Sequence, residues 1–215
     1  MTLRLKLAVA ALAMLVVALM LPTAAYADPT SLTFILNVNN IGATNPVAQA
    51  VFTFDSGHID VTVTGLSGST LFGNGAGSGM FGFNSTNSGL TLGGFTNGSS
   101  LGSSGTMDGY GLFNYHVNGG AGMANAVSSF SFTISQAGGF SQNGWVSALG
   151  IHINDAGYSM AVHFFQNGFT GFGSTTDQNG CPDCSNQITP EPTSMFLLGT
   201  GLIGMGGVLR RKMKR

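Results

Sequence analysis

The chain has 215 residues, and only 7% of them are charged, against roughly 25% in an average soluble protein. All seven lysine and arginine residues lie at the two ends, so residues 7–209 contain none. Without cations this long segment cannot neutralise phosphates, which argues against nucleic-acid binding and against enzymes that act on phosphorylated or carboxylated small molecules.

Residues 1–27 have the pattern of a secretory signal peptide. Arg4 and Lys6 form the positive segment, residues 7–21 are apolar, and Ala25 and Ala27 are the small residues of an A-x-A cleavage site. We predict cleavage after Ala27, and the alternative is an N-terminal helix that stays attached. Residues 28–190 contain seven aspartates and no lysine or arginine, so their formal charge is −7 with neutral histidines.

The body, which we place at residues 28–180, alternates apolar and polar residues as half-buried strands do. A strand that contains Phe52 and Phe54 is expected to pair with the segment 59–64 across Ser56 and Gly57. Further strands are predicted over residues 32–38, 129–135, 146–153 and 160–165.

Asn-Gly dipeptides, which favour tight hairpin turns, begin at six positions of the chain. These are Asn74, Asn97, Asn118, Asn143, Asn167 and Asn179. Residues 65–109 are rich in Gly, Ser and Asn, and their strand register does not follow from the sequence. Since no amphipathic helix is evident before the C-terminal tail, we predict an all-β body, an antiparallel β-sandwich.

The histidines and acidic residues of the body offer several weak candidate sites. His58 and Asp60 share one face of a predicted strand, and His152 and His163 lie on neighbouring predicted strands with Asp155 nearby. We interpret these histidines as surface or structural residues. Asp60 with Asp108 or Asp155 would be a glycosidase-like pair, but residues 155–157 are more simply a turn. We expect no enzyme activity, no cofactor and no metal.

Four aromatic residues of the body are candidates for stacking on sugar rings, although a lone tryptophan in a β-sandwich usually belongs to the core. They are Tyr110, Tyr115, Trp145 and Tyr158.

A short stalk, residues 181–189, contains both cysteines of the chain, Cys181 and Cys184. In an exported protein two such cysteines favour a local disulfide. The alternative, a zinc site, needs four ligands, and no second C-x-x-C is present.

The C-terminal tail, residues 190–215, combines three features in a fixed order. A Pro-Glu-Pro triplet (Pro190, Glu191 and Pro192) precedes a glycine-containing apolar run over residues 195–209, which is about as short as a spanning helix can be. The tail ends in the basic residues Arg210, Arg211, Lys212, Lys214 and Arg215, which the positive-inside rule keeps in the cytoplasm. A permanent membrane anchor is the alternative to a removable signal.

This tail resembles the PEP-CTERM protein-sorting tail of Gram-negative bacteria. The triplet, the Leu- and Gly-containing segment 197–202 and the basic residues 210–212 carry the resemblance. It implies export across the inner membrane, transient anchoring by a transmembrane helix, processing near the triplet by an exosortase, and delivery to the cell surface or outside. The catalytic residues of that reaction belong to the exosortase.

Together these features predict an exported surface protein with a structural or adhesive role, associated with exopolysaccharide or a biofilm matrix. The alternative functions are a carbohydrate-binding module, a secreted hydrolase and a plain tail-anchored membrane protein. Exosortase and exopolysaccharide are the expected partners.

Overall fold

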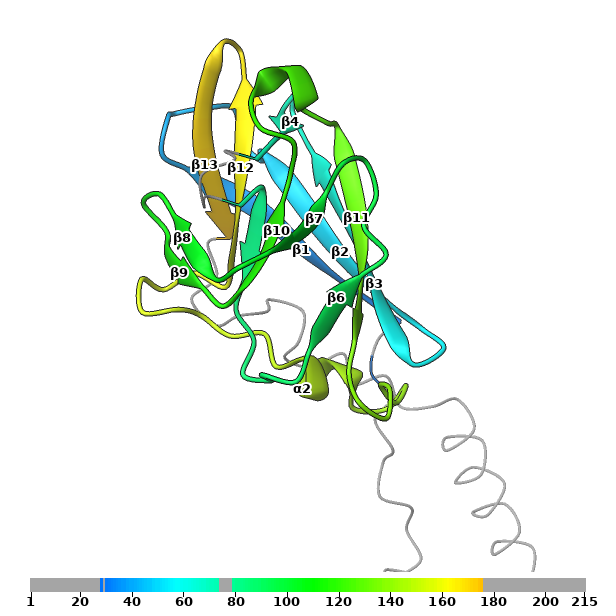
Figure 1. Ribbon diagram of the computed structural model, residues 1–215. Coiled ribbons are helices and arrows are strands. Elements are labelled where there is room, and N and C mark those ends of the chain that lie inside the picture. Colours follow the sequence, from blue (N-terminus) through cyan, green and yellow to red (C-terminus); the bar gives the residue numbers. More distant parts are fainter. Residues whose placement is uncertain (1–27, 29, 74–78, 176–215) are drawn as a thin grey trace, which may run out of the picture. The chain divides into compact units, whose positions relative to one another are not determined.

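The computed structural model describes residue 28, residues 30–73 and residues 79–175, and almost all of its regular structure is β-strand (Figure 1). Two short helices interrupt the strands, the 3₁₀ helix η1 (Met123–Asn125) and the α-helix α2 (Trp145–Leu149). The strands are β1 (Ser31–Asn39), β2 (Ala48–Asp55), β3 (His58–Gly65), β4 (Thr70–Leu71), β5 (Phe81–Phe83), β6 (Thr91–Gly93), β7 (Ser100–Gly102), β8 (Gly105–Met107), β9 (Gly111–Phe113), β10 (Tyr115–Asn118), β11 (Ser129–Ser135), β12 (Met160–Gln166) and β13 (Phe169–Thr175).

Eleven of the strands form one antiparallel sheet. Its order is β6-β11-β3-β2-β1-β13-β12-β5-β10-β7, with β4 paired to β12, while β8 and β9 form a separate hairpin. The two ends of this path, β6 and β7, lie close to each other, so the sheet curves around the core (Figure 1). The predicted antiparallel all-β body is therefore confirmed. Its main core is enclosed by one continuous curved sheet rather than by the two separate sheets of a sandwich.

The β2–β3 hairpin forms as the alternation of the sequence predicts. Asp55 pairs with His58, and the register continues to Ala48 opposite Gly65. Ser56 and Gly57 between the strands have φ of 48° and 100°. This left-handed conformation fits the twist of a two-residue hairpin turn.

Only two of the predicted Asn-Gly turns have both residues at positive φ among the residues that the structure describes. Asn97 and Gly98 have φ of 52° and 73°, and Asn167 and Gly168, between β12 and β13, have φ of 52° and 92°. Asn118 lies at the end of β10, and Asn143 precedes α2. Asn74 and Asn179 lie outside the described residues.

The strand predicted over residues 146–153 is wrong, because the chain forms helix α2 there. Gly144 and Gly150 flank the helix with φ of 101° and 60°, which interrupts an extended backbone at both ends. Trp145 and Leu149, one helical turn apart, are both fully buried. The buried residues thus have the spacing of a short helix, whereas our prediction assumed the alternation of a strand.

Asp28, at the N-terminal end of the body's sequence, caps this helix. Its Oδ2 accepts hydrogen bonds from the backbone N–H groups of Gly144 (2.9 Å) and Val146 (3.0 Å). These are N–H groups that a helix start leaves without intrahelical partners. The residue that would begin the chain after cleavage at Ala27 therefore holds a distant segment in place.

The main core lies inside the curved sheet and consists largely of phenylalanine rings. Phe52 contacts Phe34 and Phe83 edge-on at centroid distances of 5.3 and 6.2 Å. A smaller cluster lies under the β8–β9 hairpin and contains Met107, Tyr110, Phe113, Ala161 and Phe172. Strand β12 packs on both clusters, so nearly all of its residues are buried on either face.

Candidate functional site

Three side chains that can bind metals or protons gather at the β2–β3 hairpin. Asp55 ends β2, while His58 and Asp60 lie two residues apart in β3. Side chains at i and i+2 of a strand point to the same face, and the hairpin register brings Asp55 opposite His58. The predicted shared face of His58 and Asp60 is therefore confirmed, and Asp55 is a third member that the sequence analysis missed.

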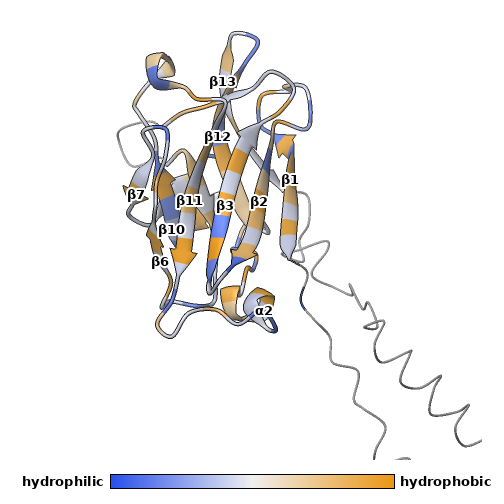
Figure 2. Ribbon diagram, turned by 90° about the vertical axis from the view of Figure 1, so that its right-hand side faces the viewer, coloured by the Kyte–Doolittle hydropathy of each residue, from blue (hydrophilic) through white to orange (hydrophobic). Residues whose placement is uncertain are grey.

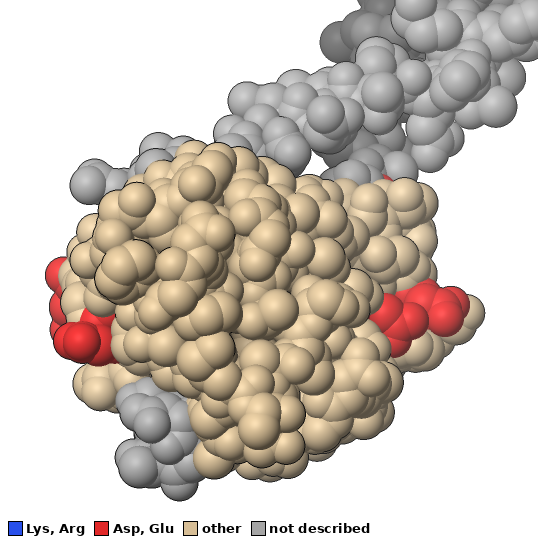
Figure 3. All heavy atoms as spheres, turned by 90° about the horizontal axis from the view of Figure 1, so that it is seen from above, with Lys and Arg blue, Asp and Glu red and all other residues tan. Residues whose placement is uncertain are grey.

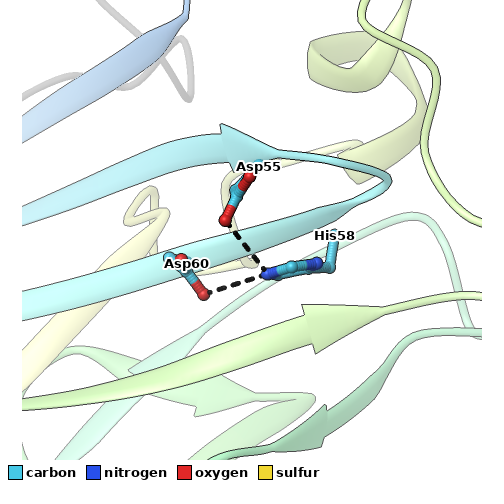
Figure 4. A group of neighbouring side chains, drawn as sticks. All are labelled: Asp55, His58 and Asp60. Carbon is cyan, nitrogen blue, oxygen red and sulfur yellow. Dashed lines mark ion pairs between the residues drawn. The ribbon is translucent and has the colours of Figure 1, made fainter.

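The two carboxylates approach the same nitrogen of the imidazole (Figure 4). His58 Nε2 lies 3.5 Å from Asp60 Oδ1 and 3.8 Å from Asp55 Oδ2. The side chains of His58, Asp55 and Asp60 are 36%, 58% and 51% exposed, so solvent reaches all three. We refer to these residues as the Asp-His-Asp cluster.

Two hydroxyl groups orient the carboxylates of this cluster. Ser56 Oγ donates to Asp55 Oδ1 over 2.9 Å, and Thr133 Oγ1, from the neighbouring strand β11, donates to Asp60 Oδ1 over 3.1 Å. Asp60 and Thr133 are directly opposite in the β3–β11 register. The cluster is thus supported by three adjacent strands of one sheet.

The other predicted combination, His152 and His163 with Asp155, does not assemble. His163 is buried between the rings of Phe72 and Phe172, at centroid distances of 4.0 and 4.4 Å. Asp155 follows Asn154 in a turn closed by a hydrogen bond from Gly157 N to Asn154 O. Among the described residues, the Asp-His-Asp cluster is the one group of three His, Cys, Asp or Glu side chains whose donor atoms lie within 4.8 Å of one another.

Two histidines are interior residues with altered proton affinity. Burial lowers the pKa of His163 to about 4, which outweighs the opposing hydrogen bond with the Phe72 backbone. Burial also lowers the pKa of His116, which is 1% exposed. Both imidazoles are therefore neutral at physiological pH and serve as packing groups, as we expected of structural histidines.

A second candidate site is the outer surface of strands β1, β2, β3 and β11, which lie side by side (Figure 2). Cross-strand pairing aligns Thr33, Val51, Thr62 and Ser131 in one row across the four strands. The adjacent rows are Ile35, Gln49, Thr64 and Ser129, and Ser31, Thr53, Asp60 and Thr133.

All twelve residues are partly or fully exposed, and only Asp60 carries a formal charge. We call this surface the Ser/Thr face. Its hydroxyl and amide groups both donate and accept hydrogen bonds, and its Asp60 edge belongs to the Asp-His-Asp cluster.

The aromatic residues proposed for sugar stacking are mostly unavailable. Trp145 is fully buried, and Tyr110 is 3% exposed in the smaller core cluster. Tyr115 stacks on Phe83 at 5.1 Å and donates its hydroxyl to Asn87 O, while Tyr158 packs edge-on against Tyr110. Phe169, just after the Asn-Gly turn that joins β12 and β13, is instead 68% exposed.

The charge pattern of the body follows its sequence. The described residues include five aspartates and no lysine or arginine, and Figure 3 shows carboxylates at separate places on a surface that otherwise lacks formal charge. Of these aspartates, Asp28 caps α2 and two belong to the Asp-His-Asp cluster. The described surface therefore offers hydrogen-bonding groups and a few negative charges, two of which lie together in the Asp-His-Asp cluster.

Several predicted sites lie outside the described residues. They are the cleavage signal (Ala25, Ala27), the cysteine pair (Cys181, Cys184), the triplet (Pro190, Glu191, Pro192) and the basic cluster (Arg210, Arg211, Lys212, Lys214, Arg215). In the part of the chain that the structure describes, no helix has the length and apolarity needed to cross a membrane.

Comparison with protein-family models finds the PEP-CTERM protein-sorting motif at residues 189–212. The resemblance of the tail is thereby confirmed. This motif is a recognition signal for exosortase processing, and it implies export, membrane anchoring through the C-terminal signal and delivery to the surface. No curated protein and no solved structure gives a significant match to the chain.

Proposed function

We propose, from the PEP-CTERM motif that ends this chain, that the β-sheet body is the delivered part of an exosortase substrate and has a non-catalytic, structural or adhesive role in extracellular polysaccharide. The sorting motif carries the proposal, because it directs the protein to the surface where such polymers lie. The body supplies a binding surface that matches their chemistry, the Ser/Thr face.

The Ser/Thr face suits a hydroxyl-rich polymer for two reasons. Its rows of hydroxyl and amide groups can exchange hydrogen bonds with sugar hydroxyls in either direction. Its position on four long, mutually paired strands makes it a rigid platform, so little conformational entropy is lost when a polymer binds. The polymer itself does not need to carry charge.

The burial of Trp145 and Tyr110 argues against a carbohydrate-binding module that stacks sugars on those rings. An adhesive surface that uses many weak hydrogen bonds fits the described residues better. Such a surface binds through repeated contacts along a polymer rather than through one deep pocket.

The sorting step can be tested by intact-mass measurement of protein from the producing cells. We expect a mature chain that begins at Asp28 and lacks the residues after the triplet. Replacing Pro190, Glu191 and Pro192 together by alanine should leave the tail attached and the protein in the membrane fraction. Pro182→Ala, a proline outside the motif, is the control and should not alter processing. A wild-type protein that retains residues 193–215 would instead indicate a permanent anchor.

The adhesive role can be tested by co-sedimentation of the exported protein with the insoluble extracellular polysaccharide of the same cells. Thr62→Arg places a long cation at the centre of the Ser/Thr face, and we expect it to weaken binding about tenfold or more, since neighbouring contacts are also blocked. Thr106→Arg, on the exposed part of β8, is the matched control with the same chemistry elsewhere. Equal binding by both variants would show that the Ser/Thr face is not the adhesive surface.

A further inference from the structure

We propose that Asp55, His58 and Asp60 form a binding site for one divalent first-row transition-metal ion, such as Zn²⁺. The site would lie at the end of the β2–β3 hairpin, and the inference does not depend on the sorting of the protein. It also departs from our expectations that the protein binds no metal and that His58 is a surface or structural residue.

The spacing of the donor atoms supports a shared ion better than direct bonding among the three side chains. The distances of 3.5 and 3.8 Å from His58 Nε2 to the two carboxylates exceed those of a good N–H···O hydrogen bond. Donor atoms held about 2.0–2.2 Å from a tetrahedral ion lie about 3.4 Å apart. Small rotations of exposed side chains would bring the donors to that separation.

The charge balance of the chain provides a second argument. Two carboxylates face one imidazole, and the sequence contains no lysine or arginine between residues 7 and 209 to neutralise them. The donor oxygens of the two carboxylates lie within 4.8 Å of each other, and like charges this close repel each other. A divalent cation bound between them would remove this repulsion.

The surroundings of the cluster already hold the carboxylates in position. Ser56 and Thr133 donate hydrogen bonds to Asp55 and Asp60 respectively. Hydrogen-bonding groups of this kind orient the ligands of metal sites and strengthen binding. The hairpin register fixes the three side chains on one face, so the protein spends little entropy in assembling them.

The ligand set indicates which ions to expect. An imidazole nitrogen favours zinc, copper, nickel and iron, whereas two carboxylates alone would suit magnesium or calcium. Three protein ligands leave at least one coordination position for water or for an oxygen of another molecule. The partial exposure of all three side chains leaves that position accessible.

Isothermal titration with Zn²⁺ of the exported protein, purified without a histidine tag, tests the site. Cys181→Ser and Cys184→Ser are introduced first, so that thiols cannot contribute ligands. We expect saturable binding of about one ion per chain, and His58→Ala should weaken it at least about tenfold. His152→Ala, which removes another partly exposed imidazole, is the matched control and should bind as the parent does.

Two further variants separate loss of a ligand from loss of the fold. Asp55→Asn and Asp60→Asn keep the shape of the side chains, and each should also weaken Zn²⁺ binding, whereas Asp155→Asn should not. Circular dichroism verifies that the variants remain folded. Absence of saturable binding, or equal weakening by His152→Ala and His58→Ala, would overturn the proposal.

Discussion

His163 illustrates how a single residue acquires a role that its sequence neighbours do not reveal. In an isolated strand, alternation would leave every second residue at the surface. Strand β12 instead has the main core on one face and the smaller cluster on the other, so His163 is 6% exposed between two phenylalanine rings. Gly82, on the adjacent strand β5, leaves room for the other buried histidine, His116. A Cβ at Gly82 would lie 2.9 Å from His116 Cδ2.

The burial of His163 predicts that the protein loses stability in acid. The pKa of His163 is 6.5 when unperturbed and about 4 in the folded protein, so the unfolded state binds more protons between these values. The stability that the neutral, buried His163 contributes is fully present above pH 6.5. The free energy of unfolding then falls, by about 3 kcal/mol at most, as the pH drops from 6.5 to 4. Urea unfolding of the wild type as a function of pH measures this slope.

His163→Gln provides the comparison, because glutamine keeps a hydrogen-bond donor but does not titrate. The variant should show a smaller loss of unfolding free energy between pH 6.5 and 4, even if it is less stable at pH 7. An unchanged slope would assign the acid sensitivity to other groups.

Among the elements, the β2–β3 hairpin and helix α2 differ in how well local sequence predicts them. The hairpin has clear alternation and a two-residue turn, so local preferences and tertiary pairing agree. In α2 the helix has only five residues, too few to be stable alone. Its conformation depends on the buried Trp145 and Leu149, the glycines at its ends and the carboxylate of Asp28, which is more than a hundred residues away.

Gly150, at the end of α2, should tolerate alanine poorly. Its φ is 60°, and a Cβ at this position would collide with Thr86 Oγ1. The backbone N–H of Thr86 also donates a hydrogen bond to the Gly150 carbonyl. Gly150→Ala should lower the unfolding free energy by about 2 kcal/mol or more, from left-handed strain plus the collision. Chemical denaturation measures this loss.

Gly68→Ala is the matched control for that collision. Gly68 also has positive φ, at 79°, but a Cβ there would meet no atom within 4 Å. Its substitution should cost only the strain, about 1 kcal/mol. Equal losses in the two variants would show that Thr86 moves aside without cost.

Across the body, the curved sheet is held together by phenylalanine rings from strands that are distant in sequence. Phe132 of β11 has ring neighbours at 6.1–6.3 Å, which are Phe81, Phe83, Phe95 and Phe130. It is 1% exposed and connects β11 with β5, the strand that lies across the core. Strands β11 and β5 are not neighbours in the strand order, so ring packing rather than strand pairing connects them.

Phe132→Ala should therefore destabilise the whole body. We expect a loss of about 3–5 kcal/mol of unfolding free energy, from lost burial and the cavity that remains. Phe169→Ala removes an equal ring that is 68% exposed and should change stability by less than about 0.5 kcal/mol. Urea unfolding monitored by circular dichroism compares the two, and similar losses would contradict the proposed role of the interior rings.

The sorting signal of this protein and the local character of its body could be predicted from the sequence alone. The ordered triplet, apolar run and basic end are contiguous, so the sorting motif could be recognised without a fold. The alternation of β1, β2, β3 and β11 and the turn at Ser56 and Gly57 are equally local. Each of these features depends on residues close together in the chain.

The joining of the strands into one curved sheet and the meeting of distant polar residues became evident in the folded protein alone. The pairing of β1 with β13, the burial of His116 and His163, and the capping of α2 by Asp28 involve residues far apart in sequence. The Asp-His-Asp cluster lies between these cases: its residues are close in sequence, but β11 supplies the Thr133 that orients Asp60. Long-range packing selects among such contacts, because many strand orders are compatible with the same local alternation.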